Sequence, residues 1–302
     1  MTVIAAVGFL PNVWLFDLAS QLRLVHAAVL LVCLIILLLV RSHTGIAIVL
    51  VGSLVNAAPI IMMYQDRQQI PANDGKVISI LNFNSEFQHN DQVEQFEDLV
   101  SKREPDVVAL VEVDKKWIDA IEPTMRRYPY SKIFLVGPGM AFFCKFPIEQ
   151  CEARYYGRSH HPRITATIRV DNRPVRLIFA HPTTPKNENG YHERNQEISL
   201  LGQEVSALPS PKVLIGDLNC GPWSPVFGNL LKAGLRDSQQ GFGPQPSWPA
   251  RVGRVIDGMP IPPLVPIDHV LASEDIVVLQ RTAGPSIGSD HLPVFVKIVL
   301  PK

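Results

Sequence analysis

The sequence has 302 residues, of which 47% are hydrophobic, and its 28 basic and 28 acidic side chains give a formal net charge of zero. This length accommodates one large domain and a smaller segment, and the absence of net positive charge argues against a protein that coats nucleic acid through its phosphates. The cysteines Cys33, Cys144, Cys151 and Cys220 have no CxxC or Cys/His spacing, which argues against a zinc site and leaves a Cys144–Cys151 disulfide open.

The N-terminal 63 residues form an apolar segment with three charged side chains, Asp17, Arg23 and Arg41. Leu24–Val40 and Thr44–Met63 carry no formal charge, and a helix needs ~20 apolar residues to cross a bilayer. We therefore expect a transmembrane helical hairpin that contacts the lipid bilayer through residues 24–63. Two buried helices of a soluble core are the alternative interpretation.

Residues 1–16 are also uncharged, but Pro11 and Asn12 interrupt them, so a third span and an interfacial helix both remain open. Arg41 and His43 lie between the two long apolar runs. Because basic side chains favour the cytoplasmic face, this connection is expected in the cytoplasm and the rest of the chain on the other side. The sequence thus predicts a multi-pass membrane protein with an extracytoplasmic domain.

The chain changes character after the membrane segment. Residues 1–64 are expected to form the anchor, the polar residues 65–75 a linker, and residues 76–302 a globular domain. When the two arginines and the one aspartate of the anchor are left out, 26 basic and 27 acidic residues remain. The rest of the chain therefore has a net charge of about −1. The anchor and the domain therefore differ in composition, as two separate units would.

Strand and helix patterns alternate in the globular domain. The expected strands are Val77–Phe83, Val107–Val113, Ile164–Val170, Val175–Ala180, Val213–Ile215, His269–Ala272, Ile276–Leu279 and Pro293–Leu300. A helix is expected from Val93 to Pro105 and another over His192–Leu208. The turn residues 171–174 predict a hairpin, and hairpins mixed with helical crossovers indicate an α/β domain with mixed sheets.

Polar side chains stand where these strands begin or end. They are Asn84, Glu112, His181, Asp217, Asn219, Asp268, Asp290 and His291. Each one alone has an ordinary explanation as a turn former, a loop cap or a solvated residue. Because strand after strand carries such a side chain, we expect them to meet at one rim of the domain.

These residues and their neighbours resemble the endonuclease/exonuclease/phosphatase superfamily from about Lys76 to the C-terminus. The motifs are ILNFN at 80–84, PDVVALVEV at 105–113, AHP at 180–182, GDLN at 216–219, IDHVL at 267–271 and GSDHLPV at 288–294. GDLN together with SDHLPV is the specific combination. The helical hairpin, with Trp248-Pro249 before the IDH motif, is similar to a bacterial, inner-membrane-anchored branch.

The resemblance implies a four-layer α/β sandwich of two mixed β-sheets flanked by helices. It also implies hydrolysis of phosphate esters with a divalent cation. Carboxylate and amide oxygens suit Mg²⁺ or Mn²⁺. Glu112 is the expected first ligand, Asn84 supports the metal or the phosphate, and Asp290 is a candidate for a second metal.

The resemblance assigns the catalytic roles to five other residues. Asp217 is expected to orient and deprotonate the attacking water, and Asn219 to help hold the water and the phosphate. His291 is expected to contact the phosphate, oriented by Asp268 and kept protonated by it. His181 is expected to donate to the phosphate or to the leaving oxygen.

The substrate remains open between several alternatives. A membrane-tethered nuclease is the first interpretation, and a phospholipid or inositol-phosphate phosphodiesterase or phosphatase is the second. A nuclease should have a basic rim, for which Arg154, Arg158, Arg163 and Lys186 are the candidates, whereas a lipid enzyme should have an apolar rim. Arg194 could face the phosphate, although a solvated or salt-bridged side chain is the simpler explanation. A catalytically inactive membrane-tethered binding module would show substitutions at the metal or water positions, and none occurs.

Overall fold

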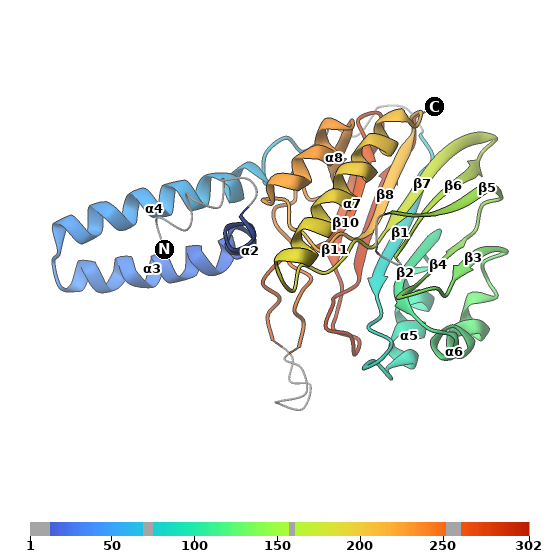
Figure 1. The fold of residues 1–302 in the computed structure, drawn as a ribbon, viewed down its shortest axis with the longest axis horizontal. Coiled ribbons are helices and arrows are strands. Elements are labelled where there is room, and N and C mark those ends of the chain that lie inside the picture. The colour runs from blue at the N-terminus through green and yellow to red at the C-terminus, as the bar shows by residue number, and fades with distance from the viewer. Residues whose placement is uncertain (1–12, 69–74, 157–160, 252–260, 302) are drawn as a thin grey trace.

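The computed structural model describes residues 13–68, 75–156, 161–251 and 261–301. Two six-stranded mixed sheets pack face to face with helices on their outer faces, and a long helical hairpin projects from one end (Figure 1). This architecture confirms the expected α/β sandwich of two mixed sheets preceded by an apolar helical hairpin.

The first sheet has the strand order β11-β12-β1-β2-β4-β3. Its members are β1 (Val77–Asn84), β2 (Val107–Val113), β3 (Tyr130–Phe134), β4 (Gly139–Cys144), β11 (Val277–Ala283) and β12 (Val294–Val299). The β1 and β2 strands are parallel, whereas β12 pairs with β1 in the antiparallel sense.

The second sheet has the strand order β5-β6-β7-β8-β10-β9. Its members are β5 (Ile148–Tyr155), β6 (Pro162–Val170), β7 (Arg173–Ala180), β8 (Lys212–Asp217), β9 (Leu235–Asp237) and β10 (Asp268–Ser273). The β7 and β8 strands are parallel, and β10 runs antiparallel to β8. The predicted hairpin is present between β6 and β7, where Asp171 and Asn172 both adopt positive φ.

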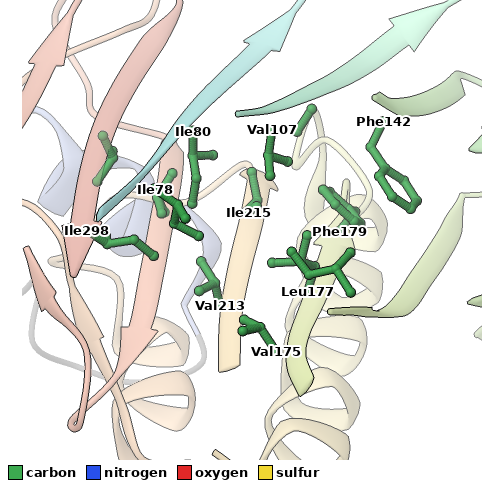
Figure 2. Packing of buried hydrophobic residues seen from close by; sticks show 14 of the residues in the cluster. Ile78, Ile80, Val107, Phe142, Val175, Leu177, Phe179, Val213, Ile215 and Ile298 are labelled. Carbon is green, nitrogen blue, oxygen red and sulfur yellow. The ribbon is translucent and has the colours of Figure 1, made fainter. Parts of the chain in front are cut away.

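Apolar side chains of both sheets fill the layer between them (Figure 2). Because side chains alternate along a strand, Ile80 of β1 enters this layer while Leu81 enters the cluster on the other side of the sheet. Phe142 of β4 and Phe179 of β7 stack across the layer with ring centroids 4.4 Å apart. The apolar core thus holds the two sheets together.

Helices cover both outer faces of the sandwich. α5 (Val93–Arg103) and α6 (Lys115–Met125) cover the first sheet, where Phe96 and Trp117 contact each other. The second sheet is covered by α7 (Glu188–Ala207) and by the short η1 (Pro225–Phe227) and α8 (Gly228–Lys232).

The N-terminal helices are α2 (Trp14–Gln21), α3 (Arg23–Leu39) and α4 (His43–Met62). Among the described helices, α4 is long and apolar enough to cross a membrane, while α2 and α3 meet that criterion only together, as a pair bent by 71°. Leu39 and Leu54 are 77% and 71% exposed, so the hairpin is not a buried element of a soluble core. The open question about residues 1–16 falls mostly outside the described residues.

Several elements differ from the sequence expectation. Strands β3, β4, β5 and β9 and helix α6 were not predicted from the sequence. Strand β5 is largely polar and helix α6 contains Pro123, which explains these two. Helix α7 begins at Glu188 rather than at His192, because the Asn187 side chain caps it by accepting from the Gly190 amide. All four cysteines are free thiols, so the Cys144–Cys151 disulfide is absent.

Gly216 has a backbone constraint that places Asp217. Its φ is +153°, and a Cβ atom there would lie 1.9 Å from the Ala180 carbonyl oxygen of the neighbouring strand. We expect Gly216→Ala to lower the free energy of unfolding by more than about 1 kcal/mol. Gly228→Ala is the matched control, because a Cβ there meets nothing within 4 Å. Equal midpoints of chemical unfolding for the two variants would contradict this account.

Candidate active site

The strand pairing brings the predicted polar residues to one end of the sandwich. The parallel strands β1 and β2 end side by side, with Asn84 paired opposite Val111, next to Glu112. In the second sheet Asp217 and Asp268 stand directly opposite each other on β8 and β10. The two sheets face each other, so the ends of β1, β2, β7, β8 and β10 surround one cleft of about 500 Å³.

Asn84 joins the two sheets at the base of this cleft. Its Nδ2 donates to Glu112 Oε1 and to Asp217 Oδ2, each at 3.1 Å. Its Oδ1 accepts from the Glu86 amide at 3.0 Å. In this orientation Nδ2 of Asn84 is a donor to the two carboxylates. Direct coordination of a metal would need the amide to flip, so that Oδ1 takes the place of Nδ2.

Glu112 is directed by an irregularity in its strand. It adopts a φ of +53°, and the pairing of β2 with β4 shifts register between Val111 and Val113. Such a bulge re-aims one side chain out of the regular alternation, and a positive φ is uncommon away from glycine and asparagine. The result is a carboxylate that is partly exposed to the cleft, between Asn84 and His181.

His291 and Asp268 form a buried ion pair. Nδ1 of His291 lies 2.8 Å from Asp268 Oδ2, and the ring is oriented further because its backbone amide donates to Ser289 Oγ. Burial by itself would lower the pKa of His291, but the carboxylates of Asp268 and Asp217 outweigh it and raise the pKa to about 10. The same contact outweighs the opposing effect of burial on Asp268 and lowers the pKa of that carboxyl.

The pKa of Asp217 is shifted in the opposite direction to that of Asp268. Burial raises its pKa to about 7, although His291 Nε2, 3.7 Å from Asp217 Oδ2, acts to lower it. A carboxyl with such a pKa accepts a proton near neutral pH. Asp217 Oδ1 also accepts a hydrogen bond from the Asn219 amide, which fixes the carboxylate in the turn after β8.

His181 is buried at the end of β7 with no hydrogen bond to either ring nitrogen among the described residues. Its Nε2 lies 3.4 Å from Glu112 Oε1 and 3.6 Å from Asp217 Oδ2. Burial lowers the pKa of the imidazole, so it is neutral at pH 7. A buried neutral imidazole between two carboxylates can ligate a cation or bind a substrate oxygen.

Asn219 and Asp290 lie at the edges of the same cleft. Asn219 adopts a φ of +50°, and its side-chain amide donates to the Pro182 carbonyl. Asp290 accepts a hydrogen bond from Trp248 Nε1 at 2.9 Å and lies 3.8 Å from His291. Asp290 joins neither of the ligand groups found among the described residues, so its role at a second metal stays a prediction.

Two groups of side chains within the described residues have ligand atoms close enough to hold a metal: Glu112, His181 and Asp217, and Asp217, Asp268 and His291. In the second group Asp268 and His291 already neutralise each other. The first group fits a cation better, because Glu112 faces the cleft and neither ring nitrogen of His181 has a hydrogen-bond partner in the part of the chain that the structure describes. Within this group Glu112 supplies the cleft-facing carboxylate oxygens that Mg²⁺ and Mn²⁺ prefer, and Asp217 and His181 lie next to that position.

Among the described residues, the rim of the cleft has few basic side chains. Of the four basic candidates, Lys186 lines the cleft, whereas Arg163 is buried in an ion pair with Glu204 and Arg154 pairs with Glu152. Arg158 lies outside the described residues. Apolar side chains line the cleft as well, among them Val265, Ile267 and Trp248.

The cleft also contains residues that the sequence interpretation missed. Leu18 and Gln21 of α2 form part of its wall, although they belong to the segment assigned to the membrane anchor. Arg194 is fully buried and ion-paired with Asp17, which is the salt bridge considered from the sequence. The available signal was Asp17 itself, the single acidic residue among the first 63. A lone charge in an apolar segment needs a partner.

A family model described as the endonuclease/exonuclease/phosphatase family matches residues 80–291. No curated protein sequence matches the chain.

Solved structures share the fold at low sequence identity. TDP2 from D. rerio complexed with a single-strand DNA product has a TM-score of 0.63 and 16% identity, covering 74% of this chain and 99% of that chain. TDP2 from Caenorhabditis elegans has a TM-score of 0.60 and 14% identity over 80% and 79% of the two chains. An endonuclease/exonuclease/phosphatase from Beutenbergia cavernae has a TM-score of 0.59 and 17% identity over 75% and 72%.

The metal-binding group can be tested without any substrate. We expect Glu112→Gln to weaken binding of Mn²⁺ or Mg²⁺ by more than about 10-fold, because loss of even an outer contact to a ligand costs about that much. Titration calorimetry on the full chain measures the affinity. Glu94→Gln on the exposed start of α5 is the control. Unchanged affinity in Glu112→Gln would exclude this carboxylate as a ligand.

Proposed function

The chain belongs to the endonuclease/exonuclease/phosphatase family, and from this premise we propose that it is a divalent-metal-dependent phosphodiesterase held at a membrane by its N-terminal segment. Residues 76–302 are the proposed catalytic domain, residues 65–75 the linker, and residues 1–64 the anchor. The observation that carries the enzymatic part is the buried arrangement of Asp217, His291 and Asp268. In this arrangement a carboxylate that can act as a base, Asp217, lies beside a positively charged imidazolium, His291, at neutral pH.

The pKa values of these groups separate their roles. Asp217, with a pKa raised to about 7 by burial, takes the proton of the attacking water. His291, with a pKa raised to about 10 by the neighbouring carboxylates, stays protonated and stabilises negative charge on the phosphoryl oxygens. Asp268 holds the ring of His291 in place through Nδ1.

The remaining residues position the water and the phosphate. Asn84 fixes the carboxylates of Glu112 and Asp217 relative to each other. Asn219, at the turn after β8, and His181, at the end of β7, bind substrate oxygens. A divalent cation bound at Glu112 would neutralise charge on the phosphate, and Asp290 is the proposed site for a second cation.

Two substrate classes are proposed, each supported by a different observation. A nucleic acid is the first, supported by the shared fold with a D. rerio protein described as complexed with a single-strand DNA product. A phospholipid or inositol phosphate is the second, supported by the apolar side chains of Leu18, Val265 and Ile267 in the otherwise polar lining of the cleft. Hydrolysis of plasmid DNA that falls with rising salt would favour the first, whereas turnover restricted to lipid or inositol phosphates would favour the second.

The membrane assignment is part of the proposal. The hairpin of α3 and α4 projects from the sandwich (Figure 1). Many of its apolar side chains are exposed, which supports insertion in a bilayer. The positively charged connection at Arg41 supports a cytoplasmic hairpin tip and an extracytoplasmic catalytic domain in a bacterial inner membrane.

Asp217→Asn tests the proposed general base. We expect kcat to fall by ~10²–10⁴ while the protein stays folded, because asparagine keeps the shape but cannot accept the proton. Hydrolysis of DNA and of a phospholipid and inositol-phosphate panel is measured with Mg²⁺ on the full chain in phospholipid vesicles. Asp171→Asn at the exposed β6–β7 turn is the control for the same chemical change. Wild-type rates in Asp217→Asn would refute the role.

Asp268→Asn tests the charge on His291. Because its pKa is raised to about 10, His291 is protonated below that pH and loses its charge above it. The kcat/KM of the wild type should therefore fall only as the pH approaches about 10. Removing the Asp268 carboxylate lowers the pKa of His291, so the decline should begin at a lower pH. A pH–rate profile with an unmoved alkaline limb would contradict this assignment.

A further inference from the structure

Helix α2 is bound to the catalytic sandwich by a buried ion pair. Asp17 is 1% exposed, and its Oδ2 lies 2.6 Å from Nη2 of Arg194 on α7. Its other carboxylate oxygen accepts a hydrogen bond from Ser224 Oγ. A buried charge that loses its partner is strongly unfavourable, so this pair keeps α2 on the sandwich.

The same guanidinium extends the contact to the catalytic turn. Nη1 of Arg194 donates to the carbonyl oxygen of Asn219 at 2.7 Å. The backbone amide of Asn219 in turn donates to Asp217 Oδ1 at 2.8 Å. Three successive polar contacts therefore lead from Asp17 on α2 to the proposed general base.

Further contacts of α2 hold the loops on either side of the cleft. Gln21 Oε1 accepts from the Gly221 amide at 3.0 Å, two residues beyond Asn219. Trp14 Nε1 donates to the Pro185 carbonyl at 3.1 Å, in the loop that follows His181. Leu18 and Gln21 also line the cleft. Helix α2 thus forms part of the cleft wall and makes hydrogen bonds to the two adjoining loops.

We propose that α2 is a positioning element of the active site: its Asp17–Arg194 pair and Gln21 fix the 217–224 turn, so the N-terminal segment is required for full catalytic rate and not for anchoring alone. This inference rests on the proposed phosphodiesterase function. Asp17 touches neither substrate nor metal and acts through Arg194 and Asn219. Because a displacement of ~1 Å at a reacting group can cost ~10²-fold, loss of this support lowers kcat.

The test compares two disrupted ion pairs of helix α7. Asp17→Asn removes the charge that faces Arg194, whereas the control Glu204→Gln removes the charge that faces Arg163, 2.8 Å away. Neither Glu204 nor Arg163 lines the cleft. The full chains are reconstituted in phospholipid vesicles with Mg²⁺. Hydrolysis of bis(4-nitrophenyl) phosphate gives kcat and KM per folded molecule, and amide hydrogen exchange reports on residues 217–224.

The expected result separates positioning from plain stability. Asp17→Asn should lower kcat by ~10–100-fold, with KM within about 3-fold, and should speed amide exchange in residues 217–224. Glu204→Gln should leave kcat and the exchange of that turn unchanged. A kcat for folded Asp17→Asn within about 2-fold of wild type, or an equal loss in both variants, would overturn the proposal.

A second variant keeps the test decisive if Asp17→Asn does not fold. Gln21→Ala removes the hydrogen bond with the Gly221 amide and a longer one to Asp17 Oδ2, but it keeps the Asp17–Arg194 ion pair. It should lower kcat by about 5-fold, the equivalent of one such bond, and speed exchange at Gly221. If both measurements match wild type, α2 is not a positioning element. An inactive wild type would refute the proposed function, and the exchange of the turn would still decide whether α2 holds it.

Discussion

The structure depends on keeping two acidic groups buried side by side. The antiparallel pairing of β8 and β10 places Asp217 directly opposite Asp268, and both are shielded from water. An uncompensated buried charge costs several kcal/mol. The protonated ring of His291, 2.8 Å from one carboxylate and 3.7 Å from the other, reduces this cost. A single imidazolium therefore reduces the cost of burying both carboxylates and favours the ionised form of each, whereas burial raises the pKa of Asp217.

This requirement constrains elements far apart in the chain. His291 reaches the two acids because the turn before β12 is held to β1, where Ser289 Oγ donates to the Asn84 carbonyl. The Asn84 side chain then reaches across to Asp217 in the other sheet. Each sheet thus contributes groups that satisfy buried atoms of the other. The packed apolar layer of Figure 2 fixes the separation of the two sheets.

The sequence predicted much of this site, because strand ends are recognisable and their side chains must meet at one rim. Asp217, Asp268 and His291 come together as expected. The direction of the Glu112 side chain could not be predicted from the sequence, because it follows from a bulge and a positive φ that hydrophobic periodicity does not reveal. The contribution of Asp17 was also missed. Its partner Arg194 lies 177 positions away, and no local pattern encodes such a distance.

The docking of α2 also bears on which substrates can reach the cleft. Leu22 alone separates α2 from α3, so the wall that Leu18 provides lies beside the base of the apolar hairpin (Figure 1). With the hairpin in a bilayer, the cleft opens close to the membrane surface. A phosphoester carried by a lipid then meets the apolar wall without leaving the interface. A nucleic acid must instead approach a cleft where Lys186 supplies little positive charge. In this arrangement α2 would both support the 217–224 turn, as proposed, and form the part of the cleft wall that adjoins the hairpin.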